Sequence, residues 1–397
     1  MNRRPVLTFV IVCAVATAGL VAYLLNAGSR MRESAAAPSA SETPADLSPA
    51  PAPATATPPE PSATSQSAQA DAAAASPETP TATSPAPAVA RLTTPASAPA
   101  AVPENQRVFF RHNGADGHFG SVAWIDTAKP ADVHYVDTLH CEVVHVSGGH
   151  GICLSADRGV FTTYAATLFD TATLVPGNSF PLKGIPSRTR MSADGRLAGL
   201  TVFVSGHGYT TLDFSTQTLL VDVASSAVVA DLETFAVTRN GTSFTEPDFN
   251  FWGITFTPDA KNFYATLSTG GQHFLIRGDI AARRAEIVHE NVECPSLSPD
   301  ARRVAYKKRL MDGSRVQWQL HVLELATGRE TALSEKRSID DQLEWLDNRH
   351  VLYSVPSSAD GSSPSTDVWQ IAIDAGTPPK RFLRNAYSPA AARNTPR

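Results

Sequence analysis

The sequence has few cysteines and no excess of positive charge. Four cysteines occur in 397 residues, and three of them, Cys141, Cys153 and Cys294, follow residue 105. Three cysteines cannot form the disulfide framework of a small secreted domain. One bridge is possible outside the cytoplasm, but the expected strand register does not place Cys141 directly opposite Cys153, which argues against it. The formal net charge of −5 argues against nucleic acid as a partner.

Residues 33–105 lack aromatic residues and glycine altogether, and consist mostly of Ala, Pro, Ser and Thr. Such a segment cannot bury enough apolar surface to offset the entropy that ordering would cost. We therefore predict a disordered linker, in which the prolines favour an extended conformation. A linker of this length is suited to hold a folded domain away from a membrane.

Known catalytic and metal-binding motifs are also missing. The sequence has no G-x-S-x-G elbow, no H-E-x-x-H pair, no phosphate-binding P-loop and no D-x-D-x-D-G calcium loop. Two stretches are rich in potential metal ligands, namely His140, Cys141, His145 and His150, and then Asn113, Asp116 and His118. In a strand, neighbouring residues point to opposite faces, and Asn and Asp are ordinary turn residues. We therefore expect no metal, no cofactor and no enzyme activity.

The chain does contain an apolar run at residues 6–25, without a charged residue. A helix of about 20 apolar residues can cross a bilayer. Arg3 and Arg4 precede the run and favour a cytoplasmic N-terminus. We predict a single-pass membrane anchor over residues 1–32, with the rest of the chain outside the cytoplasm. The alternative is a signal peptide with a cleavage site near Ala16-Thr17-Ala18, which would give a secreted protein.

The remaining residues, 106–397, repeat one pattern six times. Each copy ends a strand with an acidic residue followed by a turn, and these residues are Asp126, Asp170, Asp222, Asp279, Glu324 and Asp374. Neighbouring copies lie 44 to 57 residues apart. An acidic side chain at this position can accept hydrogen bonds from the backbone N–H groups of the turn, so the pattern marks a recurring structural unit.

A second signal, Ser-Pro-Asp or a close variant, precedes a strand in several copies. It occurs at Ser192–Asp194, Thr257–Asp259 and Ser298–Asp300, ahead of strands predicted at Leu197–Val204, Asn262–Leu267 and Arg303–Lys308. The signal therefore predicts the hairpin between the first two strands of a unit. In the second unit we take Cys141–Val146 as the first strand and place Asp157 at the second turn.

Six units of about 50 residues, each with four strands, indicate an all-β fold, a six-bladed β-propeller. A flat array of the same units would leave sheet edges exposed. The first unit starts at Arg107–His112 without an innermost strand, whereas Tyr387-Ser388-Pro389-Ala390 near the C-terminus resembles the start of a unit. We predict that these C-terminal residues supply the missing strand and close the ring.

The repeat resembles that of a known family. Pro295-Ser296-Leu297-Ser298-Pro299-Asp300, followed by Arg303-Val304-Ala305-Tyr306, looks like the WD-repeat-like motif of TolB-like bacterial β-propellers. Weaker copies occur at Met191–Gly195 and Phe256–Asp259, and the resemblance covers roughly residues 107–390. It implies a protein-binding scaffold of the bacterial envelope and no particular activity. TolB carries an α/β domain before its propeller, whereas this chain has the predicted anchor and linker there.

The most unusual loop is Ser243–Gly253, SFTEPDFNFWG. We expect it on the same rim of the ring as the loop Ser205–Tyr209, because both connect strands at that end. Convergent loops form concave sites, and aromatic residues are enriched at interfaces. The predicted ligand-binding rim consists of His207, Tyr209, Glu246, Asp248 and Phe249. Packing between blades is the alternative use of the aromatic residues in this loop.

These features together predict a membrane-tethered, extracytoplasmic propeller that binds a protein or a cell-envelope polymer. Two other classes of function stay open. One is a hydrolase or lyase that uses carboxylates at the channel mouth, such as Glu246 and Asp248. The other is a structural spacer without a ligand.

Overall fold

The computed structural model describes residues 106–204, 215–358, 365–374 and 376–392. The predicted anchor and linker fall on residues 1–105 and lie outside the described residues, as do His207 and Tyr209 of the predicted rim. Within the described ranges, no helix has the length and apolar character needed to span a membrane. The predictions that fall outside these ranges stay predictions.

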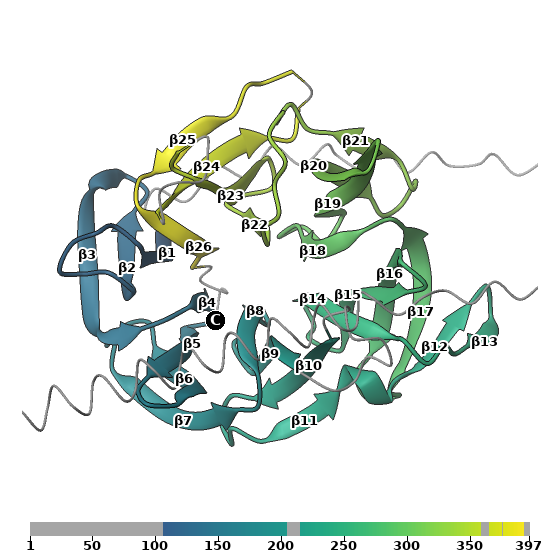
Figure 1. Cartoon of the computed structure of the whole chain (residues 1–397), viewed down its shortest axis with the longest axis horizontal. Helices are drawn as coiled ribbons and strands as arrows, with labels where there is room; N and C mark the ends of the chain where they lie inside the picture. Colours follow the sequence, from purple (N-terminus) through teal and green to yellow (C-terminus); the bar gives the residue numbers. More distant parts are fainter. Residues whose placement is uncertain (1–105, 205–214, 359–364, 375, 393–397) are drawn as a thin grey trace, which may run out of the picture. The chain divides into compact units, whose positions relative to one another are not determined.

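Six β-sheets stand around a common axis and form the blades of a propeller (Figure 1). The strands of blades 1 to 3, from the inside outwards, are as follows. Blade 1 contains β26 (Ala386–Ala391), β1 (Arg107–His112), β2 (Ser121–Asp126) and β3 (Lys129–His140). Blade 2 contains β4 (Val143–Ser147), β5 (His150–Arg158), β6 (Thr162–Asp170) and β7 (Pro176–Leu182). Blade 3 contains β8 (Ile185–Met191), β9 (Leu197–Val204), β10 (Ser215–Asp222) and β11 (Val228–Asp231).

Blades 4 to 6 complete the ring (Figure 1). Blade 4 contains β14 (Asn250–Phe256), β15 (Asn262–Thr269), β16 (Gln272–Asp279), β17 (Arg284–Glu290), β12 (Ala236–Arg239) and β13 (Thr242–Phe244). Blade 5 contains β18 (Glu293–Leu297), β19 (Arg303–Asp312), β20 (Arg315–Glu324) and β21 (Glu330–Ala332). Blade 6 contains β22 (Glu344–Trp345), β23 (His350–Pro356), β24 (Thr366–Ala372) and β25 (Lys380–Leu383). The prediction of an all-β, six-bladed propeller is confirmed.

The Ser-Pro-Asp signal forms the predicted hairpin by a fixed set of hydrogen bonds. In blade 5, Ser298 Oγ donates to Asp300 Oδ1 at 2.6 Å and accepts from the backbone N–H of Arg303 at 3.0 Å. Thr257 and Asp259 make the same pair of contacts in blade 4, at 2.6 and 3.1 Å. The hydroxyl and the carboxylate thus satisfy backbone groups that a tight turn leaves without partners.

The ring closes as predicted, because β26 pairs antiparallel with β1. The Ser-Pro pair of this strand has a different position from the one its sequence suggested. Ser388 lies inside the strand, not in a hairpin turn, and has a φ of 53°. Cys294 has a similar place in β18, with a φ of 50°. Its Oγ donates to the backbone oxygen of Val144 at 2.8 Å, so this bulged residue joins blade 1 to blade 2.

Blade 4 departs from the expected four strands. The chain between β11 and β14 contains a short 3₁₀ helix, η1 (Leu232–Thr234), and then β12 and β13. The β12 strand pairs parallel with the outermost regular strand β17, and β13 pairs with β12. The sequence repeat predicted no such extension, because the added hairpin joins the blade by long-range pairing that no local pattern records.

A disulfide joins Cys141 to Cys153, which corrects the expectation that they would stay unbridged. The partner of Cys153 in the β4–β5 ladder is Val144, so Cys141 is indeed not directly opposite. Cys141 lies before β4, where its Cα comes within 5.3 Å of that of Cys153, a normal distance for a disulfide. The loop leading into the strand, and not the ladder itself, brings the two sulfurs together.

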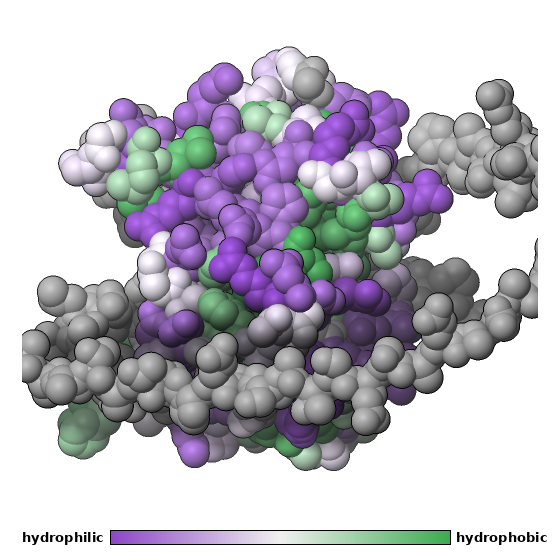
Figure 2. All heavy atoms as spheres, turned by 90° about the vertical axis from the view of Figure 1, so that its right-hand side faces the viewer, coloured by the Kyte–Doolittle hydropathy of each residue, from purple (hydrophilic) through white to green (hydrophobic). Residues whose placement is uncertain are grey.

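The hydrophobic core consists of the layers between neighbouring blades. Fully buried aromatic side chains lie in several of them, among them Phe109, Phe263, Tyr306 and Trp345. Trp345 Nε1 also donates to the backbone oxygen of Ser296 at 2.8 Å, which connects blade 6 to blade 5. The outer side of the ring near blades 4 and 5 is mainly hydrophilic, with hydrophobic residues only in small patches (Figure 2). The described residues that are visible in this view form no broad apolar area.

Candidate ligand-binding site

The ring has two different faces. At one face, which we call the turn face, hairpins join the first strand of a blade to the second and the third to the fourth. At the other, the crossover face, the second strand joins the third and the chain passes from one blade to the next. Each face carries a cavity among the described residues, with a volume of about 580 Å³ on the turn face and about 430 Å³ on the crossover face.

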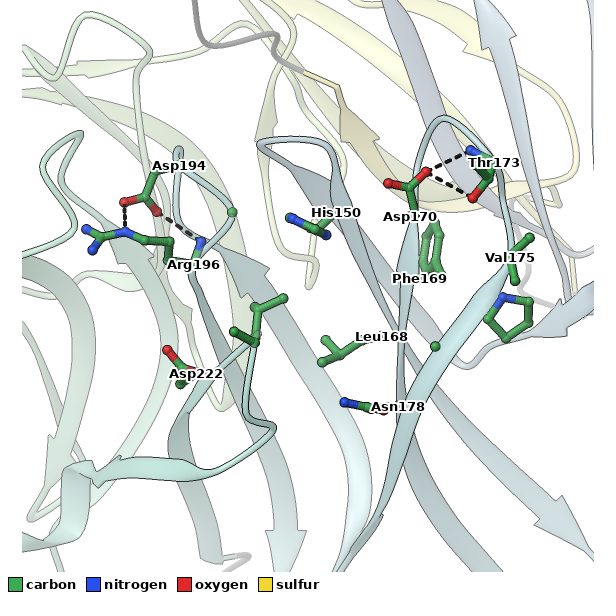
Figure 3. Close-up of a pocket in the computed structure, with 15 residues that line it drawn as sticks. His150, Leu168, Phe169, Asp170, Thr173, Val175, Asn178, Asp194, Arg196 and Asp222 are labelled. Carbon is green, nitrogen blue, oxygen red and sulfur yellow. Dashed lines mark hydrogen bonds and ion pairs between the residues drawn. The ribbon is translucent and has the colours of Figure 1, made fainter. Parts of the chain in front are cut away.

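The turn-face cavity lies between blades 2 and 3 and is lined by several polar side chains (Figure 3). Its carboxylates accept hydrogen bonds within the turns to which they belong. Asp170 Oδ1 accepts from the backbone N–H and the hydroxyl of Thr173, at 2.8 and 3.0 Å, and these hydrogen bonds lower the pKa of Asp170. Asp222 accepts from Ser225 N at 2.8 Å, and Asp194 accepts from Arg196 Nε at 2.6 Å. These carboxylates thus have a structural role in the repeated turns, which accounts for their presence in the cavity.

The crossover-face cavity has a composition that the repeat does not explain. Residues of blades 3, 4 and 5 and of the segment between β21 and β22 line it. They include Arg188, Phe203, Trp252, Glu293, Cys294, Lys307, Trp318 and Asp340. Three aromatic rings, two cations and two carboxylates therefore share a single space. We take this cavity as the candidate site.

Irregular backbone positions several of these side chains. The register of β8 against β9 shifts between Pro186 and Arg188, and that of β14 against β15 shifts just after Trp252. The register of β18 against β19 shifts between Glu293 and Ser296. A β-bulge changes the direction of the side chains beside it and is common next to functional sites. The innermost strands of three adjacent blades are thus bulged at the level of the cavity.

Glu293 organises one side of the cavity. It is 5% exposed, and its Oε1 accepts from Trp318 Nε1 at 3.1 Å. Lys307 Nζ lies 3.5 Å from Glu293 Oε2 and 4.9 Å from the centre of the Trp318 ring. The ring of His273 lies 3.8 Å from Glu293 Oε1. Burial and the nearby cations keep the pKa of His273 below its usual value, so this ring is neutral at pH 7. The buried carboxylate of Glu293 is therefore matched by Lys307.

The two cations of the cavity keep their charge. Burial alone would lower the pKa of Lys307, but the acidic groups of Cys294, Asp340 and Glu293 raise it above the ordinary value. The pKa of Arg188 is likewise raised by neighbouring acidic groups against the effect of its burial. Asp340, whose side chain is 52% exposed, accepts a hydrogen bond from Lys307 Nζ and lies 3.9 Å from Arg188 Nη2. The mouth of the cavity thus holds two permanent cations and one exposed carboxylate.

The described part of the predicted rim does not line this cavity. Asp248 accepts hydrogen bonds from Thr269 Oγ1 and from Gly270 N, the latter at 2.7 Å, and so holds the β13–β14 connection over the β15–β16 hairpin. Phe249 packs against Phe244, with ring centroids 5.4 Å apart. Glu246 is exposed on the same connection. Asp248 and Phe249 therefore have structural contacts, and the binding role predicted for the rim stays a prediction.

Sequence reasoning missed Arg188, Lys307 and Trp318 as site residues. Lys307 lies in the predicted strand Arg303–Lys308, where neighbouring basic residues are typical of a solvated edge, but only 4% of it is exposed. Alternation gave no signal here, because residues of both parities are buried in this strand, among them Val304, Ala305 and Tyr306. Among the described residues, no group of His, Cys, Asp and Glu side chains could hold a metal ion.

The sequence matches no known protein-family model and no curated protein. The fold is similar to that of solved propeller structures. TolB from Acinetobacter baumannii shares 16% identity with a TM-score of 0.50, and the match covers 73% of this chain and 67% of that one. A putative TolB from Agrobacterium tumefaciens shares 13% identity with a TM-score of 0.39, over 70% and 88% of the two chains. A chain of a nidogen/laminin complex shares 12% identity with a TM-score of 0.47, over 73% and 99%.

Identities this low concern the fold alone, and among the three structures named above the TolB from Acinetobacter baumannii has a TM-score of 0.50. That likeness agrees with the motif at residues 295–306, the six blades and the closure by the C-terminal strand. The fold of this chain is a TolB-like six-bladed β-propeller.

Proposed function

We propose that this chain is an extracytoplasmic binding scaffold, held at the membrane by its N-terminal segment, and that its crossover face binds a protein partner. The observation that carries the proposal is the cavity of about 430 Å³, which combines aromatic side chains with a buried lysine and a partly buried arginine. Cavities of this size bind ligands, and aromatic residues and arginine dominate binding energy at protein interfaces. The TolB-like fold adds support, because the resemblance implies a protein-binding scaffold. The anchor rests on the apolar run at residues 6–25.

The enzyme alternative has less support. A hydrolase or lyase would need two carboxylates that face a shared space, and Glu246 and Asp248 were the predicted pair. Neither residue lines the crossover-face cavity, and Asp248 holds the turn at Thr269 and Gly270. The cavity does contain two other carboxylates, Glu293 and Asp340, but each of them is paired with Lys307. A binding role uses the residues that line the cavity.

Site-specific photocrosslinking in intact cells tests the proposal. A photoreactive residue replaces Glu246 or Met311, both exposed on the crossover face of the full-length chain. The matched control carries it at Ser225, which is exposed on the turn face. We expect a defined crosslinked species from the crossover face only, and its digestion by protease identifies a protein. A species resistant to protease would indicate an envelope polymer, and equal crosslinking from both faces would contradict the proposal.

A further inference from the structure

We propose that the crossover-face cavity recognises a carboxylate that lies next to an apolar or aromatic side chain of the bound partner. Arg188 is the main anion-binding residue, and Asp340 occupies the place of the ligand carboxylate when the site is empty. This inference rests on the proposed function and names the chemistry by which the partner is recognised. The carboxylate can belong to the C-terminus of the partner or to an Asp or Glu side chain.

Arg188 is a partly buried cation, with a side chain 18% exposed, and has few hydrogen-bond partners in the described part of the chain. Its Nη1 donates to the backbone oxygen of Ser187 at 2.8 Å, and its Nε has no hydrogen-bond partner. The nearest carboxylate oxygen paired with it, Asp340 Oδ1, is 3.9 Å away, beyond hydrogen-bonding distance. A guanidinium presents its donors in a planar fork that matches a carboxylate, and a buried donor without an acceptor is costly. The buried carboxylate of Asp341 also acts on the charge of Arg188, but the Nε of Arg188 leaves hydrogen-bonding capacity for an anion.

The other cation of the cavity, Lys307, donates a hydrogen bond to Asp340 but also has a second carboxylate beside it. Lys307 Nζ lies 3.5 Å from the buried carboxylate of Glu293, which also accepts from Trp318. Glu293 cannot leave this position, because its side chain is 6% exposed and shares the interior with Lys307. Of the two acidic side chains of the cavity, only Asp340 is half exposed. The exchangeable anion of the site is thus the carboxylate of Asp340.

The chain around Asp340 permits this exchange. The residue before it, Ile339, is buried, and its N–H donates to Trp318 O at 3.0 Å. The residue after it, Asp341, is buried and accepts from Ser354 N at 2.7 Å. The backbone is therefore held on both sides, and a rotation of the Asp340 side chain into solvent is sufficient to admit a ligand carboxylate. The repulsion between two carboxylates would complete the displacement.

The walls of the cavity determine what accompanies the carboxylate. Phe203, Trp252 and Trp318 line the space beside Arg188. Aromatic rings bind apolar and aromatic side chains by burial and by offset or edge contacts. A volume of about 430 Å³ is small for a folded segment and suits one or two side chains of a peptide. The combination fits a carboxylate with an adjacent phenylalanine or leucine.

Peptide binding to the full-length chain in nanodiscs tests the inference. Three acetylated hexapeptides serve as probes: five alanines followed by phenylalanine with a free carboxylate, the same peptide as an amide, and an amidated peptide with an internal Glu-Phe pair. We expect at least one carboxylate peptide to bind about tenfold more tightly than the neutral amide, since a charge-assisted hydrogen bond is involved. The comparison of the two acidic peptides distinguishes a terminal from a side-chain carboxylate.

Two variants test the roles proposed for Arg188 and Asp340. Arg188→Met should reduce the affinity for the carboxylate peptides to that of the neutral amide, with Arg196→Met on the turn face as the matched control that leaves binding unchanged. Asp340→Asn removes the internal competitor and should tighten carboxylate binding about threefold or more while leaving amide binding alone. Because Asp340 is half exposed, this variant stays informative if Arg188→Met fails to fold.

Equal affinities for the three peptides, or weaker carboxylate binding by Asp340→Asn, would overturn the inference. The proposed function fails separately. If crosslinking from the crossover face persists in Asp340→Asn while the peptides show no preference for a carboxylate, the scaffold function stands and the recognition chemistry proposed for it is wrong.

Discussion

At the scale of single residues, backbone conformation limits which side chains the blades accept. Gly148 and Gly195 have φ of 58° and 72° and meet where blade 2 packs against blade 3. A Cβ on Gly195 would lie 2.9 Å from the oxygen of Gly148 and 3.1 Å from that of Ser147. Neither oxygen can move freely, because both belong to the backbone of the β4–β5 hairpin. Glycine is therefore required here for two independent reasons.

Gly195→Ala should lower the free energy of unfolding by about 2 kcal/mol or more, since positive φ and a clash with backbone act together. The matched variant is Gly241→Ala, where φ is 75° but nothing lies within 4 Å of an added Cβ. That variant should lower the free energy of unfolding by only about 1 kcal/mol, because only the backbone conformation is unfavourable. Urea denaturation measures both, and equal losses would show that the contact between blades carries no cost.

Glu335 makes the stability dependent on pH. Burial alone would raise its pKa, but Arg337 donates to it at 2.9 and 2.6 Å and Tyr353 at 2.5 Å, which lowers the pKa to about 2. A depressed carboxyl pKa stabilises the fold above the unfolded value of 4.5, and this contribution is lost as the pH falls from 4.5 towards 2.

We therefore expect the wild type to lose about 3 kcal/mol of stability from this group between pH 4.5 and 2. Glu335→Gln should be less stable at pH 7 and should lack this part of the pH dependence. Glu246→Gln, the same change at an exposed position, is the control. A constant stability difference between wild type and Glu335→Gln from pH 7 to 2 would contradict the prediction.

At the scale of elements, each blade is built from local hairpins and then fixed by a few long-range contacts. The hairpins follow the repeated turns, whereas contacts such as Ser388 with Val144 and Trp345 with Ser296 join blades. Blade 2 has an additional covalent constraint in the disulfide between Cys141 and Cys153. Because the bridged residues are 12 positions apart, the disulfide constrains mainly the first hairpin of this blade.

Removal of the disulfide in a Cys141→Ala, Cys153→Ala variant should lower the free energy of unfolding by about 3 kcal/mol, as expected for a closed loop of this length. Unfolding in urea, with and without a reductant, measures the effect. The reductant should destabilise the wild type and leave the variant unchanged. An unfolding midpoint that is the same for both proteins would show that the bridge does not contribute to stability.

At the scale of the whole molecule, the ring depends on one pairing between the two ends of the described chain. The β26 strand completes blade 1, and its buried residues Ala386, Ala390 and Ala391 pack in the layers next to blades 2 and 6. Without this strand, the edge of β1 and the buried side chains of Val108 and Phe110 would contact water. Such an edge is also a site of aggregation.

Deletion of residues 385–397 should therefore lower the melting temperature by about 10 °C or more and promote aggregation. Deletion of residues 393–397 alone leaves β26 complete and serves as the control. Differential scanning calorimetry of both proteins decides the matter. A melting temperature unchanged by the longer deletion would mean that the ring does not depend on its closing strand.

The sequence by itself determined the repeat, and with it the hairpins, the number of blades and the closing strand. These features are local: an acidic turn, a Ser-Pro-Asp hairpin and period-two alternation act within a few residues and recur along the chain. The strand Leu197–Val204 was predicted with its observed bounds for this reason. Packing of one sheet face against the next then favours a closed ring.

Only the tertiary structure decided which residues share the cavity. Arg188, Trp252, Glu293 and Lys307 come from four strands of three blades, and bulges that no alternation pattern records turn their side chains inwards. The disulfide and the attachment of β12 to β17 are likewise products of chain segments that meet after folding. A local pattern specifies each sheet, but a site shared by several sheets depends on distances across the ring, which are established only when the blades pack together.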